Sequence, residues 1–204
     1  MIQHFVHITP EFAFVDGKAL NHNEKGAALL TELYRAHIGD YPKFFKMDTL
    51  SKLGFVASEL LLQAEGELRF EPREDRAVVL FNRSASLQAD TNFQATIQDP
   101  ENFFPSPAAF VYTLANIVTG EIAIRNKYYG ETSFIVLECQ QPQVMAQQAL
   151  ATFQDPMTES LISGWLDCED ENHFEAAIFL LKKGQYDNAE TLSKEITKIF
   201  NIKY

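Results

Sequence analysis

The sequence predicts an α/β fold, with a mixed, mainly parallel sheet and helices on both faces. Stretches typical of strands alternate along the chain with stretches typical of helices. Two of the strand-like stretches, AVVLF at 77–81 and TSFIVL at 132–137, are apolar without alternation, which is typical of strands covered on both faces. The 204 residues, 46% of them hydrophobic, can form a sizeable core. We therefore expect one domain over residues 1–204.

Each expected element follows from a local pattern. Apolar residues recur at helical spacing in 24–36 and most clearly in 43–65, where Asp48 or Thr49 can cap the helix. Pro10 and Gly17 interrupt the first strand. In chain order the expected elements are a short strand within 2–14, helices over 24–36 and 43–65, a strand over 77–81, a helix and loop over 88–102, a helix over 110–124, strands over 132–137, 160–166 and 175–181, and a closing helix over 186–200.

The segment 105–151 is the one around which the rest is organised. A helix over 110–124 with a wide apolar stripe is followed by a turn at 128–130 and then by the strand 132–137, which we expect at the centre of the sheet. Cys139 comes directly after this strand, and Pro142 suits the first turn of a new helix. A thiol at such a junction faces the positive end of a helix dipole, which favours the thiolate.

The same segment resembles the N-terminal half of a β-ketoacyl synthase (3-oxoacyl-ACP synthase) of the thiolase superfamily. In that family a helix with the pattern NxxAGxxAIxxGxxGP leads into a strand that ends at the catalytic cysteine. Here NIVTGEIAI occupies 116–124, GETS occupies 130–133, and Cys139 lies nine residues after Gly130. Lys46-Met47-Asp48 is similar to the start of the family's KMDxxxxxA helix. The resemblance implies a thiolase-like half-domain with its nucleophile position at Cys139.

Several features favour a non-catalytic relative. Glu131 stands where the family has proline, and Glu138, Gln140 and Gln141 surround the thiol where the family has small residues. The family's second half, with histidines in HGTGT-like and NxxxGHxxGA-like contexts, has no counterpart in these 204 residues. Glu138 disfavours a neighbouring thiolate through like charge. Cys139 can instead be a buried small apolar residue, and a shift of one residue would place Gln140 at the nucleophile position, as in homologues that resemble chain length factors.

The resemblance implies an accessory, chain-length-factor-like subunit in fatty-acid, polyene or polyketide biosynthesis, without complete condensing activity of its own. The alternative is an acyltransferase or β-ketoacyl-ACP synthase component that uses Cys139 as acyl acceptor with histidines from a partner chain. A third interpretation is an oligomeric scaffold outside lipid metabolism.

The expected partners are a second copy or a complete ketosynthase, joined through strand 132–137, and an acyl carrier protein. Basic side chains could dock the carrier protein, although solvated surface side chains are the simpler interpretation: Lys43, Lys46 and Lys52, or Arg125 and Lys127.

The composition argues against nucleic-acid binding, secretion and a membrane span. The net charge of −11 and the pI near 4.9 argue against nucleic-acid binding, which needs clustered Lys and Arg. The sequence has no run of eighteen apolar residues and no basic, apolar leader, so we expect a cytoplasmic protein without a membrane span and with reduced cysteines.

Cofactor and metal sites are not expected either. No GxGxxG or GxxxxGK pattern occurs. On a strand, His4 and His7 point to opposite faces, so they do not form a metal pair. The acidic run at 167–171 is expected to be a solvated loop, and Cys168 beside it is expected to be a packing residue.

Overall fold

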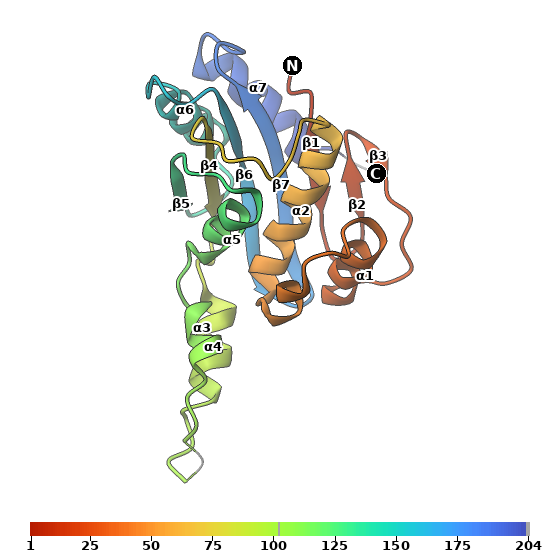
Figure 1. Ribbon diagram of the computed structural model, residues 1–204, viewed down its shortest axis with the longest axis vertical. Helices are drawn as coiled ribbons and strands as arrows, with labels where there is room; N and C mark the ends of the chain where they lie inside the picture. The colour runs from red at the N-terminus through yellow and green to blue at the C-terminus, as the bar shows by residue number, and fades with distance from the viewer. Residues whose placement is uncertain (102, 203–204) are drawn as a thin grey trace.

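A seven-stranded mixed sheet forms the centre of the computed structural model, which describes residues 1–101 and 103–202 (Figure 1). The strand order is β3-β2-β1-β7-β6-β4-β5. β4 pairs in parallel with β5 and β6, whereas β7 pairs antiparallel with both β6 and β1. β1 therefore points the same way as β4, β5 and β6. The strands are β1 (Phe5–Ile8), β2 (Ala13–Val15), β3 (Lys18–Ala19), β4 (Arg76–Asn82), β5 (Thr132–Val136), β6 (Ser160–Asp170) and β7 (His173–Lys182).

Helices cover both faces of this mixed sheet, which confirms the predicted α/β architecture. The prediction of a mainly parallel sheet is wrong, because four of the six strand pairings among the described residues are antiparallel and two are parallel. Alternate residues of β4 show the division: Val78 and Leu80 belong to the apolar cluster on one face, and Val79 and Phe81 to the cluster on the other. α1 (Ala27–His37), α2 (Thr49–Glu65) and α5 (Ile117–Asn126) pack on the first face, and α6 (Pro142–Thr152) and α7 (Ala189–Phe200) on the second. No helix among the described residues is long and apolar enough to cross a bilayer.

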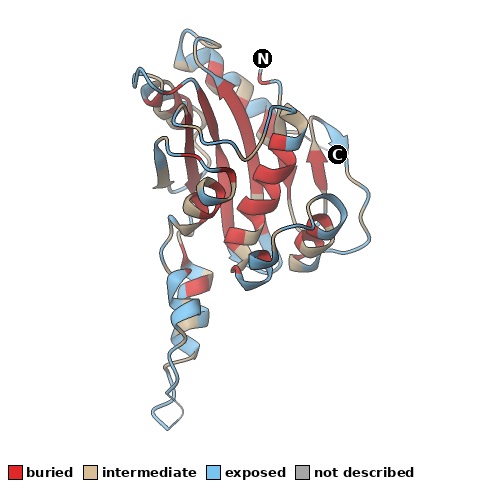
Figure 2. Cartoon of the chain, viewed as in Figure 1, coloured by how far each residue is buried: buried red, intermediate tan, exposed pale blue. Residues whose placement is uncertain are grey.

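α2 is the most deeply buried helix, as Figure 2 shows. Asp48 caps it, because its carboxylate accepts the backbone N–H of Ser51 at 2.9 Å, and Gly66 ends it in the left-handed conformation. The short 3-10 helix η1 (Pro42–Lys46) precedes the cap. The predicted cap at Asp48 is thus confirmed.

The predicted helix over 110–124 is wrong as one continuous element. It consists of α4 (Pro107–Val111) and α5, separated by turns. Side chains take the carbonyls that a continuous helix would use: Ser86 Oγ donates to the Thr113 carbonyl at 2.7 Å, and Thr113 Oγ1 donates to the Phe110 carbonyl at 2.7 Å. The buried Tyr112 fixes this break against the body of the protein.

The predicted central position of strand 132–137 is also wrong. Among the described residues β5 pairs only with β4, so it forms one edge of the sheet, and Thr132 and Val136 at its ends are exposed. An apolar run without alternation therefore does not distinguish an edge strand from a central one in this chain. The acidic run at 167–171 differs from expectation too, since β6 continues through it to Asp170.

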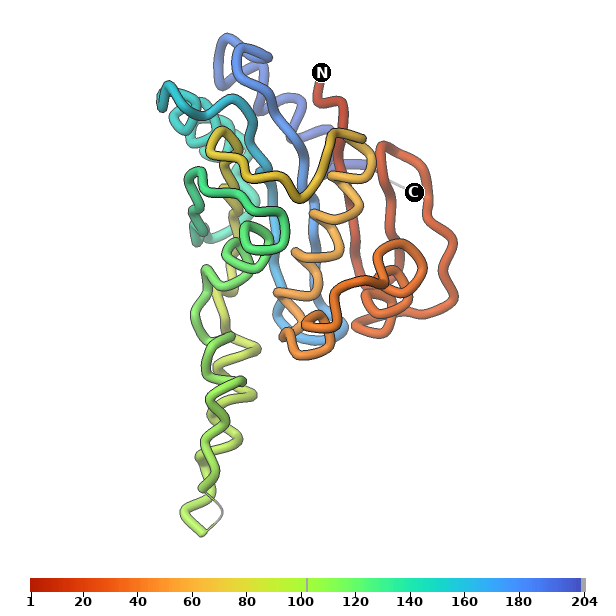
Figure 3. Tube along the Cα trace, in the orientation of Figure 1, coloured from red at the N-terminus to blue at the C-terminus, as the bar shows by residue number. Residues whose placement is uncertain are grey.

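A two-helix arm projects from the end of the sheet near β4 and α5 (Figure 3). We define the arm as residues 87–101 and 103–116, which include α3 (Leu87–Ala95) and α4. The two helices touch through the rings of Phe93 and Phe110, whose centroids are 5.3 Å apart. The arm has few other contacts, because α3 buries only Ala89 and α4 buries none of its residues.

Candidate functional site

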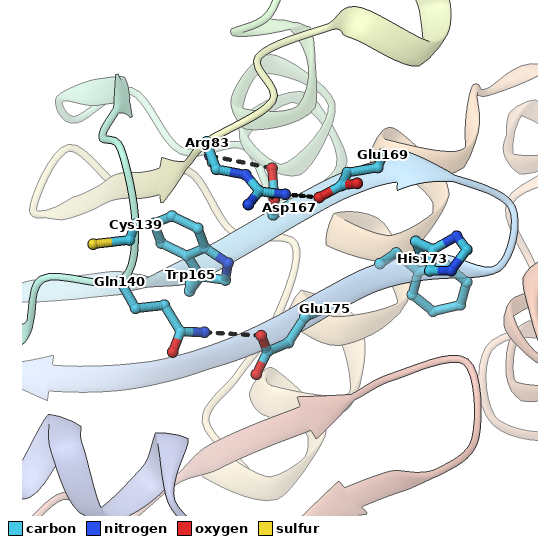
Figure 4. A pocket seen from close by; sticks show the side chains of 9 residues that line it. Arg83, Cys139, Gln140, Trp165, Asp167, Glu169, His173 and Glu175 are labelled. Atoms are coloured by element: carbon cyan, nitrogen blue, oxygen red, sulfur yellow. Dashed lines mark hydrogen bonds and ion pairs between the residues drawn. The ribbon is translucent and has the colours of Figure 1, made fainter.

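A pocket of 470 Å³ lies where β4, the segment after β5, and the β6–β7 hairpin meet (Figure 4). The parallel strands β4 and β6 bring their carboxyl ends to this edge, where open α/β sheets usually bind ligands. The lining residues come from four segments of the chain: Arg83, Cys139, Gln140, Trp165, Asp167, Glu169, His173, Phe174 and Glu175. The predicted nucleophile position therefore lies at a pocket.

Gln140 rather than Cys139 faces the other side chains of the pocket. Its amide nitrogen donates to one oxygen of Glu175 at 2.8 Å, and Nε2 of the buried His7 bonds the other oxygen at 2.9 Å. Glu175 lies on β7 and His7 on β1, so the contact joins two strands to the segment that follows β5. A carboxylate that accepts from both neighbours holds the Gln140 side chain in one orientation.

Cys139 is exposed, and in Figure 4 its sulfur points away from the ion pairs of the pocket. The interpretation of this residue as a buried apolar side chain is therefore wrong. The predicted strand-to-helix junction is confirmed, because β5 ends at Val136 and α6 begins at Pro142. The pocket's histidine, His173, lies at its far end, and Nδ1 of its largely exposed ring bonds Asp170.

Asp167 organises the opposite wall of the pocket. It accepts the backbone N–H groups of Arg83 and Ser84 at 3.1 and 2.8 Å, so it fixes the turn after β4. The Arg83 guanidinium forms an ion pair with Glu169 and lies 3.9 Å from Asp167. The acidic run at 167–171 thus has structural partners on its pocket side. The described residues contain no group of three His, Cys, Asp or Glu side chains arranged to hold a metal ion.

The remaining predicted residues occupy separate places. Cys168 is buried, and burial together with nearby carboxylates raises the pKa of its thiol to about 12. His4 bonds Asp16 at 2.9 Å, whereas His7 bonds Glu175, so the two histidines have different partners. Two of the five basic side chains considered for carrier-protein docking are paired with carboxylates: Lys43 pairs with Glu121, and Arg125 pairs with Asp40 and Glu59.

Sequence reasoning missed Glu175, Arg83 and Trp165 as pocket residues. The register of the β6–β7 hairpin, which pairs Asp167 with Glu175, brings two acidic residues to the same end of the sheet. No local motif marks Glu175, since its role depends on pairing with a strand formed by the first residues of the chain.

No protein-family model matches this sequence, and no curated protein does. Solved structures do match in fold. The ishigamide ketosynthase/chain length factor superposes with a TM-score of 0.63 at 17% identity, over 92% of this chain and 63% of that chain. The ketosynthase ApeO in complex with its chain length factor ApeC, from Xenorhabdus doucetiae, gives 0.57 at 14% identity, over 90% of this chain and 79% of that chain.

A third match is AntDE:AntF, a type II polyketide synthase acyl-carrier protein in complex with its ketosynthase bound to the hexaketide. It gives a TM-score of 0.52 at 11% identity, over 89% of this chain and 62% of that chain. This chain thus spans less than two thirds of the first and third of these structures. The likeness identifies the fold as the thiolase-like fold of ketosynthases and chain length factors, which confirms the fold that the sequence resemblance implies.

Proposed function

We propose that this chain is a ketosynthase-like accessory subunit of the chain-length-factor type. It assembles with a complete ketosynthase in fatty-acid, polyene or polyketide biosynthesis and does not complete a condensation by itself. The observation that carries the proposal is the orientation of two neighbours: Gln140 faces the pocket and is held by Glu175, while the thiol of Cys139 points away. The fold likeness to complexes of a ketosynthase with its chain length factor supports the same assignment.

The charges of the pocket also favour a non-catalytic role. A condensing enzyme needs a thiolate that holds the acyl group and hydrogen-bond donors that stabilise the oxyanion and the enolate. Beside Gln140 this pocket presents the carboxylates of Asp167, Glu169 and Glu175, which repel a developing negative charge. The one guanidinium, that of Arg83, is already paired with Glu169. The charged side chains of the pocket therefore disfavour the developing anion of a condensation.

The edge strand β5 is the proposed seam with the partner. Within the part of the chain that the structure describes, no strand pairs with its outer side, and such an edge can extend the sheet into a second molecule. Exposed apolar side chains occur in this strand and in the segment before it: Ile124 of α5, Tyr129 before β5 and Val136 at its end. A second copy or a complete ketosynthase could pair there, and an acyl carrier protein would then reach the complex through the partner.

The alternative function uses Cys139 as an acyl acceptor, with catalytic histidines from the partner chain. The exposure of this thiol at a strand-to-helix junction is what favours it. Intact-mass spectrometry separates the two functions. The chain is coexpressed with full-length ketosynthases of the same organism, and each purified complex is incubated with an acyl-loaded carrier protein.

We expect a ketosynthase to co-purify and to gain the acyl mass, and this chain to gain none, with Cys139→Ala identical to wild type. Removal of the chain from the complex should shorten or broaden the product distribution of the ketosynthase. An acyl adduct on this chain that disappears in Cys139→Ala would establish the alternative. Failure of every ketosynthase to co-purify would contradict both assignments.

A further inference from the structure

The arm concentrates the apolar surface of the molecule. Of the thirteen large hydrophobic side chains that are exposed among the described residues, six lie on the arm. Phe104 is 76% exposed and Phe110 is 53% exposed. A concentration of exposed apolar side chains in one part of a molecule is typical of an interaction surface. The six are Leu87, Phe103, Phe104, Phe110, Val111 and Leu114.

The arm also has little core to stabilise it. Figure 2 shows its ribbon mostly in the exposed class, in contrast to the sheet and α2. Its internal packing consists chiefly of Ala89 and the pair Phe93–Phe110, and Tyr112 anchors it at its base. Two short helices with so few buried contacts gain stability when another surface covers them.

The charge of the arm indicates which partner surface is complementary to it. Between Arg83 and Arg125 the sequence contains no Lys, Arg or His, and the arm carries the carboxylates Asp90, Asp99 and Glu101. The whole chain has a net charge of −11. A second copy would bring the same acidic arm and the same acidic body, and like charges across an interface disfavour association. A surface with basic side chains at its rim is complementary.

We infer that the arm docks on a different chain, into an apolar groove flanked by Lys and Arg side chains. The arm leads directly into α5 and β5, so a molecule that pairs with the β5 edge also lies beside the arm (Figure 1). The inference rests on the proposed function, because the receiving chain is the complete ketosynthase. It adds that the association is heterotypic and that the arm supplies its main apolar contacts.

Binding of purified variants to the co-purifying ketosynthase tests the arm directly. The arm variant is Phe103→Ser/Phe104→Ser, which leaves the Phe93–Phe110 contact inside the arm intact. Its matched control is Leu68→Ser, a side chain that is 81% exposed on the loop after α2. The charge variant is Asp99→Lys/Glu101→Lys, with Glu71→Lys/Glu74→Lys as its control because these residues are also exposed. Circular dichroism and thermal unfolding verify that each variant folds.

We expect the apolar variant to bind the ketosynthase at least about tenfold more weakly, as truncation of buried aromatic anchors does. The charge variant should associate several-fold more slowly at low salt, with a smaller difference at high salt. Both controls should bind within about twofold of wild type, since surface changes outside an interface have little effect. Alone at pH 7.5, the wild-type chain should be monomeric by light scattering.

Each contrary result has a distinct meaning. Wild-type binding by the apolar variant would overturn the arm as docking element and leave the proposed function intact. Faster association of the charge variant would overturn the basic rim. A dimer of the wild-type chain at pH 7.5 that the apolar variant abolishes would show that the occupant is a second copy. If neither the wild-type chain nor any variant binds a ketosynthase, both the proposed function and this inference are overturned.

Discussion

The two cysteines illustrate how environment sets the chemistry of identical side chains. Cys139 is exposed in the segment between β5 and α6, whereas Cys168 is buried on β6 with its sulfur 3.5 Å from the side-chain oxygen of Gln88. Burial and the nearby carboxylates of Asp48 and Asp167 disfavour the Cys168 thiolate and raise its pKa to about 12. Only the exposed thiol is accessible to a reagent near neutral pH.

We predict that an aromatic disulfide reagent modifies one thiol of the native protein at pH 8 and both thiols in denaturant. Cys139→Ala should abolish the native reaction, and Cys168→Ala should leave it unchanged. Absorbance of the released thiolate gives the stoichiometry. Because the thiolate is the reactive species, the Cys168 reaction should be limited by unfolding. Fast modification of Cys168 in folded Cys139→Ala would contradict the raised pKa and the burial.

At the scale of elements, the sequence predicted those with strong periodicity and erred where tertiary contacts decide. The pattern of 43–65 predicted α2 and its cap at Asp48, since cap and apolar stripe are both local signals. The break between α4 and α5 depends on Ser86, a residue distant in sequence that takes the Thr113 carbonyl. The edge position of β5 depends on which strands pair, and an apolar run carries no information on this.

In the candidate site, too, the sequence predicted the local features and not those that depend on distant strands. The position of Cys139 after a strand and before a helix is local, and the structure has it there. The direction of the side chains is not local, because Gln140 is held by Glu175 and His7 from two distant strands. The sequence could therefore place Cys139 and Gln140 between a strand and a helix but could not decide which of the two side chains faces the pocket.

The β6–β7 hairpin contains a glycine that the sheet requires. Gly164 has φ of +141°, and a Cβ at this position would lie 2.3 Å from the Ala177 carbonyl oxygen. Gly164→Ala should therefore destabilise the protein by about 1–3 kcal/mol, as overpacking in a core does. Urea unfolding followed by Trp165 fluorescence measures the change.

The neighbouring residue gives a matched control for this prediction. Among the described residues, the buried hydroxyl of Ser163 has no hydrogen-bond partner. Ser163→Ala should leave stability unchanged or raise it slightly, because it removes a polar group that gains nothing from the fold. Equal unfolding midpoints for Gly164→Ala and wild type would mean that β6 and β7 separate enough to admit a methyl group.

At the scale of the whole molecule, an acidic body is combined with an apolar arm. The net charge of −11 keeps copies apart at neutral pH through mutual repulsion. The pI near 4.9 marks the pH at which this repulsion vanishes. The exposed side chains of the arm remain apolar at every pH. The net charge therefore opposes self-association at neutral pH, while the apolar surface of the arm favours it. A lower pH weakens the charge repulsion and so favours association.

We predict that the chain alone is monomeric at pH 7.5 and self-associates as the pH falls towards 5. Light scattering at fixed protein concentration should show the molar mass rise, and 0.5 M salt at pH 7.5 should reproduce part of the rise because it screens the repulsion. Phe103→Ser/Phe104→Ser should suppress association at both conditions, whereas Leu68→Ser should not. Equal association of the arm variant and wild type near the pI would show that another surface drives it. If only the arm variant loses association, the arm is the surface through which copies associate. The negative charge of the chain then prevents this self-association at neutral pH and leaves the arm free for a partner with basic side chains.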